Sequence, residues 1–214
     1  MRVGLDLLYL VPHETGGRES YARELVPAML ERDPELELVA FVNRDGGAQL
    51  AAELGERVSA IVVPISARDR ARWAIGELAL VSLAARRARV QLVHSMANFG
   101  PPWGRFRRVL TIHDLQYQAT PELTSWPARS ATHVLLALAA RTAHRVIAVS
   151  AAGRDELVSG LRLSHERIDV IPNGVRPVPE SACTAGVRER HAVGPERTIV
   201  LSVATNIPHK NLPV

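Results

Sequence analysis

Short runs of branched and leucine-rich residues alternate with longer segments of helical spacing along most of this 214-residue chain. Seven runs have the length and composition of buried strands: 3–8, 36–42, 60–64, 90–94, 108–112, 145–149 and 169–171. Five intervening segments repeat apolar residues at helical spacing: 18–30, 48–54, 70–88, 130–143 and 151–161. Strands that alternate with helices form parallel sheets covered on both faces. The sequence therefore predicts an α/β fold built on a doubly wound, Rossmann-like parallel sheet.

The predicted helix over residues 130–143 illustrates how the pattern assigns a buried face. Val134, Leu135 and Leu138 recur there at helical spacing. Large apolar residues three and four positions apart lie on one side of a helix. We therefore expect these three side chains to cover the sheet.

A proline-rich, polar stretch interrupts the alternation after the last predicted strand. It contains Pro172, Pro177 and Pro179, followed by a short polar segment. Stretches of this composition connect domains. We therefore predict a first domain over residues 1–175 and a linker with one short helix over residues 176–196.

After the linker, residues 198–203 form a new apolar run that is typical of a strand. One strand cannot form a domain, because its faces and its backbone groups need partners. We therefore predict that residues 197–214 are the first strand and loop of a truncated second domain.

Composition narrows the class of protein. With 47% hydrophobic residues the chain can bury a sizeable core, and its single cysteine, Cys183, excludes an intramolecular disulfide and suits a reducing cytosol. The longest uninterrupted apolar run, 134–140, is far short of the roughly 20 residues that a membrane span requires. We therefore expect a cytoplasmic protein that is soluble or lies at the inner face of the membrane.

The net charge of +4 comes mostly from arginine, and three clusters stand out: Arg68-Arg70-Arg72, Arg86-Arg87-Arg89 and Arg105-Arg107-Arg108. Aromatic residues make up only 4% of the chain, too few to stack unpaired bases, which argues against nucleic acid as a partner. Charge patterning favours an ordinary solvated surface. Peripheral contact with an anionic membrane stays open as the alternative.

Chemistry is expected at the carboxyl ends of the strands, where a parallel sheet opens its crevice. After the first strand, Gly16 and Gly17 lead directly into a helix. Paired glycines let backbone N–H groups approach an anion, and the helix amino terminus adds partial positive charge. The loop therefore either binds a phosphate group or is a flexible turn. It is neither a Gly-x-Gly-x-x-Gly nor a P-loop motif, so dinucleotide and Walker-type functions lose their main support.

Polar residues follow three further strands. His113 and Asp114 come directly after the fifth strand, where a histidine can donate to a sugar hydroxyl while a carboxylate orients it. A hydrogen-bonded structural histidine is the alternative. Asn98 follows the fourth strand and could line the same crevice. Ser150 follows the sixth strand, where capping of the next helix is the simpler role.

Five segments, in this order, resemble family-four glycosyltransferases. They are Gly16-Gly17-Arg18-Glu19, Thr111-Ile112-His113-Asp114, Val146-Ile147-Ala148-Val149-Ser150, Val170-Ile171-Pro172-Asn173-Gly174-Val175, and Ile199-Val200-Leu201-Ser202-Val203 through Pro208-His209-Lys210-Asn211-Leu212. Each segment is weak alone, but their order and spacing match the family over essentially the whole chain. The bacterial mannosyltransferase-like branch, which works on polysaccharide or glycolipid acceptors, is the nearest.

The resemblance implies the amino-terminal half of a GT-B architecture, in which two Rossmann-like domains enclose the reaction. The first domain would hold the acceptor, and the second would hold most of a nucleotide-sugar donor. The family retains the anomeric configuration and mostly needs no divalent metal, so no cofactor is expected. Charge stabilisation of the leaving diphosphate replaces the metal. The site residues that the resemblance and the strand ends predict are His113 and Asp114 for catalysis, and Gly16, Gly17, Asn98, Ser150, His209 and Lys210 for binding donor or acceptor.

Two positions depart from the family pattern. His209 stands where an arginine is common and would be weaker on a diphosphate, while Ala204 stands where a glycine is common. The family's two donor-gripping glutamates fall beyond Val214, so we expect residues 1–214 to be inactive alone. Two alternatives remain: a non-catalytic fragment that binds an acceptor or docks on a membrane, and a sugar-nucleotide epimerase of the same architecture.

Overall fold

A computed structural model describes residues 1–115, 117, 125–175 and 186–201. Its first compact unit, Met1–Asn173, is built on a seven-stranded parallel sheet in the order β3-β2-β1-β4-β5-β6-β7. The strands are β1 (Arg2–Leu7), β2 (Glu37–Val42), β3 (Val58–Val62), β4 (Leu92–Ser95), β5 (Arg107–Ile112), β6 (Arg145–Ala148) and β7 (Ile168–Val170). Each overlaps one predicted strand. The predicted fold class is therefore confirmed.

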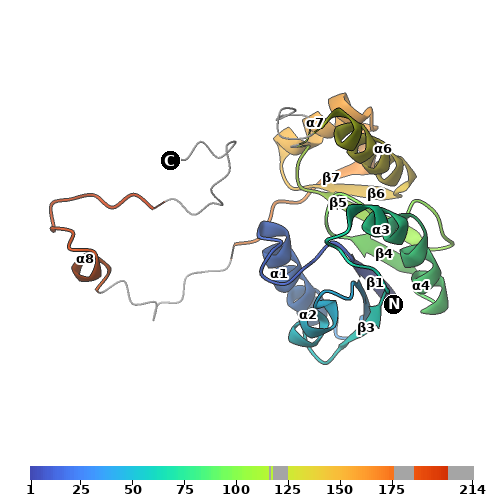
Figure 1. Cartoon of the computed structure of the whole chain (residues 1–214), viewed down its shortest axis with the longest axis horizontal. Coiled ribbons are helices and arrows are strands. Elements are labelled where there is room, and N and C mark those ends of the chain that lie inside the picture. The colour runs from blue at the N-terminus through green and yellow to red at the C-terminus, as the bar shows by residue number, and fades with distance from the viewer. Residues whose placement is uncertain (116, 118–124, 176–185, 202–214) are drawn as a thin grey trace. The chain divides into compact units, whose positions relative to one another are not determined.

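Helices cover both faces of this sheet (Figure 1). They include α1 (Gly17–Arg32), α2 (Gly47–Glu53), α4 (Val81–Arg87), α6 (Trp126–Thr142) and α7 (Ala151–Leu161), and a 3-10 turn, His165–Arg167, precedes β7. Successive residues of a strand point to opposite faces. In β2, Leu38 packs in a cluster with α1 and α2, whereas Val39 packs in a cluster with α4. Helices α6 and α7 share a third cluster with Leu110 and Val146.

The predicted buried face of α6 is wrong. Val134 is 62% exposed and Leu138 is 40% exposed. The buried residues of the helix are Leu136, Ala137, Ala139 and Ala140. Three of these four are alanines, whose small side chains let the helix approach the sheet closely. The periodicity of the large side chains therefore indicated the wrong side of the helix.

The single helix predicted over residues 70–88 consists of two α-helices joined by a wide turn. Helix α3 (Arg70–Ile75) and helix α4 flank a π-helical turn, Gly76–Leu80. Such turns occur mostly as single insertions in α-helices, frequently at functional sites. This turn carries Glu77 into the interior, where only 4% of the residue is exposed.

Glu77 lies within hydrogen-bonding reach of a second buried carboxyl group, that of Asp6 at the end of β1. Ser95 donates from Oγ to Asp6 Oδ2 at 2.8 Å. Burial raises the pKa of Asp6, and burial followed by the nearby Asp6 charge raises the pKa of Glu77 well above its usual range. Two carboxyl groups in contact cannot both ionise in such surroundings. The pair therefore shares one proton.

We expect the shared proton to make the protein less stable as pH rises. Above about pH 4.5 the unfolded carboxyl of Glu77 loses its proton while the folded one keeps it, so each pH unit lowers the contribution of Glu77 to the free energy of unfolding by up to about 1.4 kcal/mol. Glu77→Gln, whose amide can donate to Asp6 without titrating, should remove this contribution and make the slope of the free energy of unfolding against pH more positive. Urea denaturation across pH measures it, with exposed Glu35→Gln as the control. Equal slopes in Glu77→Gln and the wild type would contradict the shared proton.

The second unit, Gly174–Val214, is described over residues 174–175 and 186–201. It contains α8 (Val187–Arg190), inside the segment predicted to hold a short helix. Residues 198–201 form no strand, and Val200 and Leu201 are 89% and 81% exposed. The predicted strand is therefore wrong over these described residues, because the described part of this unit offers no other strand to pair with. The predicted division into linker and second domain stays a prediction.

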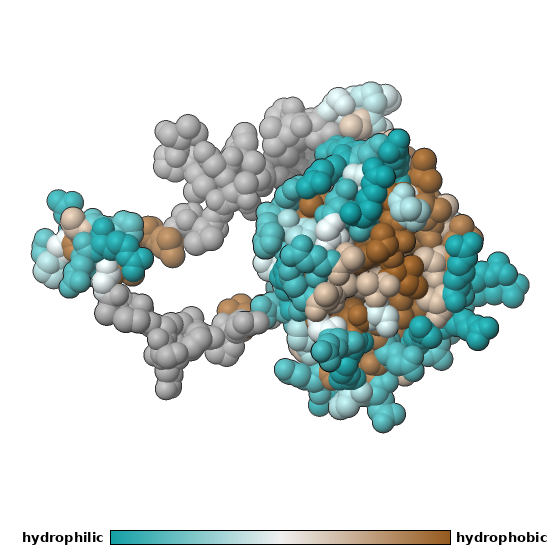
Figure 2. All heavy atoms as spheres, turned by 60° about the horizontal axis from the view of Figure 1, so that its bottom comes forward, coloured by the Kyte–Doolittle hydropathy of each residue, from teal (hydrophilic) through white to brown (hydrophobic). Residues whose placement is uncertain are grey.

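One face of the molecule gathers apolar residues in an area bordered by hydrophilic side chains (Figure 2). Large apolar side chains that remain exposed on the described part of the first unit include Val62, Ile75, Leu83 and Trp103. Over the described ranges, no helix has both the length and the apolar character needed to cross a bilayer.

Candidate active site

The strand order creates a topological switch between β1 and β4. From β1 the chain builds β2 and β3 on one side, whereas β4 to β7 continue on the other side. A crevice opens at the carboxyl ends of the strands where the order reverses. Asp6 and Ser95 are register partners at that point. The loops that follow β1, β4 and β5 therefore meet at this edge.

The loop after β1 presents the open amino terminus of α1. Gly16 is the N-cap, with φ of 64°, and no side chain caps the first turn. This left-handed conformation favours glycine. At both Gly16 and Gly17, no atom of the described residues lies within 4 Å of the position that a Cβ would occupy. The first N–H groups of a helix have no partner inside it, so this end is accessible to an anion.

Hydrogen bonds hold this loop in place, which argues against a flexible turn. Thr15 Oγ1 accepts from Val11 N and donates to Val11 O, both at 2.9 Å. The buried Glu19 accepts from His13 N at 2.7 Å through one oxygen and from Arg23 Nε at 2.8 Å through the other. The glycine pair is therefore presented on an organised support.

His113 stands at the carboxyl end of β5, half-buried beside α1. Its Nε2 is 2.8 Å from the carbonyl oxygen of Met96. A carbonyl only accepts, so Nε2 carries the proton and Nδ1 is left as an acceptor in the neutral ring. Tyr21 meets the ring edge-on at 5.0 Å. Burial, and to a lesser degree the charge of Arg18, lowers the pKa of His113, which favours the neutral form.

Asn98 ties the loop after β4 to the loop after β5. Its Oδ1 accepts from His113 N at 2.8 Å, and its Nδ2 donates to Asp114 O at 3.2 Å. Asn98 has a left-handed backbone, with φ of 61°, that asparagine tolerates better than most residues. Its amide therefore supports the backbone of His113 and Asp114. Its predicted role in binding a ligand stays a prediction, as does the catalytic role of the exposed Asp114.

The remaining predicted site residues fall into two groups. Ser150 Oγ accepts from Gly153 N at 2.9 Å, so its capping role at α7 is confirmed. Its role in binding donor or acceptor stays a prediction. His209 and Lys210 lie outside the described residues. No group of three or more His, Cys, Asp or Glu side chains with metal-binding geometry occurs in the described part of the chain.

Sequence reasoning missed a polar network behind His113. Thr111 Oγ1 lies 2.9 Å from His94 Nε2 and 3.3 Å from the hydroxyl of Tyr21. Arg18 drew attention in the sequence only as part of the Gly16-Gly17-Arg18-Glu19 segment. In the structure its guanidinium lies 5.7 Å from the centre of the Tyr9 ring, and its charge helps to lower the pKa of His113. One signal was available: Tyr21 lies one helical turn after Gly17, on the same side of α1.

His94 should make the protein sensitive to acid. Burial lowers its pKa from 6.5 to about 4. Between these values the unfolded state binds a proton that the folded state does not, so the contribution of His94 to the free energy of unfolding should fall by about 3 kcal/mol as pH decreases. His94→Gln can keep a hydrogen bond to Thr111 without titrating and should lose this dependence. Urea denaturation between these pH values tests it, and an unchanged acid sensitivity in His94→Gln would contradict it.

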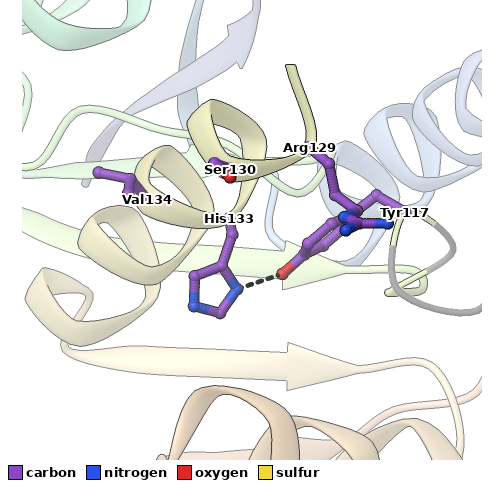
Figure 3. Close-up of a pocket in the computed structure, with 5 residues that line it drawn as sticks. All are labelled: Tyr117, Arg129, Ser130, His133 and Val134. Atoms are coloured by element: carbon purple, nitrogen blue, oxygen red, sulfur yellow. Dashed lines mark hydrogen bonds between the residues drawn. The ribbon is translucent and has the colours of Figure 1, made fainter. Parts of the chain in front are cut away.

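A cavity of about 400 Å³ lies beside α6. One of its lining residues, Tyr117, follows His113 by four positions in the sequence. It is lined by Tyr117, Arg129, Ser130, His133 and Val134, all on α6 except Tyr117 (Figure 3). The hydroxyl of Tyr117 points at His133 Nδ1, 2.9 Å away. An aromatic ring, a guanidinium and hydroxyl groups are the side chains that commonly line small-molecule sites.

Solved structures share this fold. A glycosyltransferase from Rickettsia africae matches with a TM-score of 0.53 and 13% identity, over 91% of this chain and 50% of that one. A lipopolysaccharide outer core galactosyltransferase matches with a TM-score of 0.54 and 11% identity, over 86% of this chain and 50% of that one. A putative UDP-N-acetylglucosamine 2-epimerase from Listeria monocytogenes matches with a TM-score of 0.54 and 12% identity, over 79% of this chain and 43% of that one. These likenesses show a GT-B, Rossmann-like fold.

The sequence itself matches Glycosyltransferase Family 4 over residues 15–178. This match covers more than half of the chain, which therefore belongs to that family. The predicted family resemblance is confirmed. The chain spans about half the length of the glycosyltransferases of similar structure. No curated protein matches it in sequence.

Proposed function

We propose that the protein transfers a sugar, mannose-like in our inference, from a nucleotide-sugar donor to a saccharide or glycolipid acceptor, with retention of configuration. One observation carries this proposal: the open amino terminus of α1 lies beside His113. Both are at the topological switch of the sheet, in a chain that belongs to Glycosyltransferase Family 4. Backbone N–H groups at Gly17 and the charge of Arg18 suit the oxygens of a diphosphate or of the acceptor.

His113 would act on the transferred sugar. Its Nδ1 can accept a hydrogen bond from a sugar hydroxyl, because Nε2 is committed to Met96. The lowered pKa keeps the ring neutral, so it does not oppose the positive charge that develops at the sugar during transfer. Lys210 would stabilise the leaving diphosphate, with His209 beside it. Charge stabilisation of this kind would make a divalent metal unnecessary.

The cavity beside α6 is our candidate for the acceptor. Tyr117 offers a ring on which a sugar can pack, and Arg129 and Ser130 offer hydrogen-bond donors. Its volume of about 400 Å³ is within the range of small-molecule sites. A glycolipid acceptor would place the protein in the cytoplasm, peripherally at the inner face of the membrane.

The proposal is tested with the full-length protein. Incubation with a panel of labelled nucleotide sugars, with lipid-linked and oligosaccharide acceptors, should yield a glycosylated acceptor in which the sugar keeps its anomeric configuration. Inversion of the configuration would reject the retaining mechanism. A donor that is never consumed with any acceptor would favour a non-catalytic binding protein.

Residues 1–214 alone should show no transfer and only weak donor affinity. The similar structures are about twice as long. By the family resemblance, a second domain would supply most of the donor site. Isothermal titration with nucleotide sugars and the same transfer assay check both expectations. Micromolar donor binding or steady turnover by these residues would overturn the two-domain account.

A sugar-nucleotide epimerase is the second candidate, because a putative epimerase shares the fold with a TM-score of 0.54. The two activities differ in their products. Chromatography of the nucleotide sugar after incubation without acceptor separates them, since an epimerase converts the sugar nucleotide and a transferase leaves it intact.

A further inference from the structure

Two of the three arginine clusters come together at the edge of the sheet opposite to the candidate active site. Arg86 and Arg89 end the connection that leads into β4, and Arg105 and Arg107 lead into or begin β5. In a parallel sheet these positions lie at the amino ends of the strands. The third cluster lies elsewhere, where Arg68 pairs with Glu14.

The arginines surround a cavity with an ordered wall. A cavity of about 570 Å³ is lined by Ser82, Arg86, Arg89, Val90, Trp103, Gly104, Arg105 and Phe106. Trp103 donates from Nε1 to Leu78 O at 2.6 Å, and Ser82 Oγ donates to Trp103 O at 2.7 Å. Gly104 has φ of 139°, and a Cβ there would overlap the ring of Phe106. The loop that carries Trp103 and Arg105 is therefore fixed against the helix that carries Arg86.

A second cavity of about 310 Å³ adjoins the first, sharing Gly104, Arg105 and Phe106 with it. It adds the side chains of Gln91, Arg107, Arg108 and His144. Among the described residues, no carboxylate lines either cavity and no ion pair involves Arg86, Arg89, Arg105 or Arg107. Burial and then the charges of Arg108 and Arg107 lower the pKa of His144. The paired cavities therefore concentrate positive charge that the described residues do not neutralise.

We propose that these cavities bind a phosphate-bearing small molecule or headgroup, with Arg86, Arg89 and Arg105 on the phosphate oxygens and its remaining part against Trp103. Guanidinium groups match phosphate oxygens through two parallel hydrogen bonds, and they stack on flat ligands. Trp103, 45% exposed, supplies an apolar face beside them. The combined space is large enough for a phosphate ester with a sugar- or base-sized part. This site is distinct from the crevice at His113, and it does not depend on the transfer reaction.

Pyrophosphate is the probe for the first test, with residues 1–214 as the protein. Isothermal titration should show saturable binding to one site. Arg86→Gln with Arg105→Gln should weaken this binding by more than about tenfold. The matched control, Arg70→Gln with Arg162→Gln, removes the same charge from exposed positions elsewhere and should leave binding within about twofold. Both double variants should keep the wild-type melting temperature, because all four side chains are exposed.

A local readout shows where the probe binds. Bound phosphate should raise the pKa of His144, which is measured by NMR titration of its imidazole with and without pyrophosphate. It should also change the fluorescence of Trp103, with Trp103→Phe as the reference. Absence of saturable binding, equal weakening in both double variants, or a response at neither His144 nor Trp103 would overturn the proposal.

The source of the phosphate is decided by a vesicle experiment. Co-sedimentation with vesicles of phosphatidylcholine and phosphatidic acid that pyrophosphate competes away, and that Arg86→Gln with Arg105→Gln abolishes, would support the site and assign the phosphate to a lipid headgroup. Saturable pyrophosphate binding without co-sedimentation would support the site and assign it to a soluble phosphate ester.

Discussion

Gly17→Val should abolish sugar transfer by the natural protein while leaving the fold cooperative. Gly17 is the first residue of α1, and a Cβ at this position meets no atom within 4 Å. The valine side chain would therefore clash with no described residue and would project into the open space at the amino terminus of the helix. Phosphate or acceptor oxygens need that space to reach the backbone.

The stability side of this prediction has a physical reason as well. Valine is slightly better than glycine inside a helix, so the melting temperature should not fall. Ala48→Val places the same side chain at an exposed position in the first turn of α2 and is the control for both activity and stability. Activity assays and thermal unfolding on the same samples separate the two effects. Wild-type turnover in Gly17→Val would show that no ligand approaches this loop.

His113→Ala should lower turnover more than about tenfold, equivalent to about 1.4 kcal/mol of transition-state stabilisation. The change removes the Nδ1 acceptor at the switch edge. Its contacts with Met96 and Tyr21 are few, so the melting temperature should change little. Exposed His165→Ala serves as the control and should keep full activity.

The pH dependence of the reaction adds a second readout for His113. The lowered pKa means that the ring becomes protonated only at a lower pH than an ordinary histidine does. Turnover should therefore persist below about pH 6.5 as far as His113 is concerned. Losses of activity and stability in equal measure for His113→Ala would indicate a purely structural histidine.

The sequence predicted the sheet well because strand composition and helix spacing reflect burial directly. Each of the seven strands predicted for the first domain is present, and the errors in that domain are local. The π-helical turn at Gly76–Leu80 has no signature in the spacing of apolar residues. A glutamate in a helical segment is expected at the surface, and the sequence does not show that Glu77 contacts the buried Asp6. The inward face of α6 was missed because three alanines join Leu136 on it, while Val134 and Leu138 face outward.

The candidate site was predicted in outline but not in its support. Parallel strands bring the residues after β1, β4 and β5 to one edge, so Gly17, Asn98 and His113 could be grouped from the order of the motifs. The direction of each side chain was beyond the sequence. Asn98 turns its amide to the backbone of the neighbouring loop, and the hydroxyls of Thr111 and Tyr21 meet across two elements.

The carboxyl pair at Asp6 and Glu77 also has an electrical consequence. The formal net charge of +4 counts every carboxyl group as ionised. Wherever the folded chain retains the shared proton, it carries one more positive unit than a count with every carboxyl group ionised, so it should migrate faster toward the cathode than that count implies. Unfolding releases that proton into the solution. The calorimetric enthalpy of unfolding should therefore change with the ionisation enthalpy of the buffer, with a slope that corresponds to one released proton.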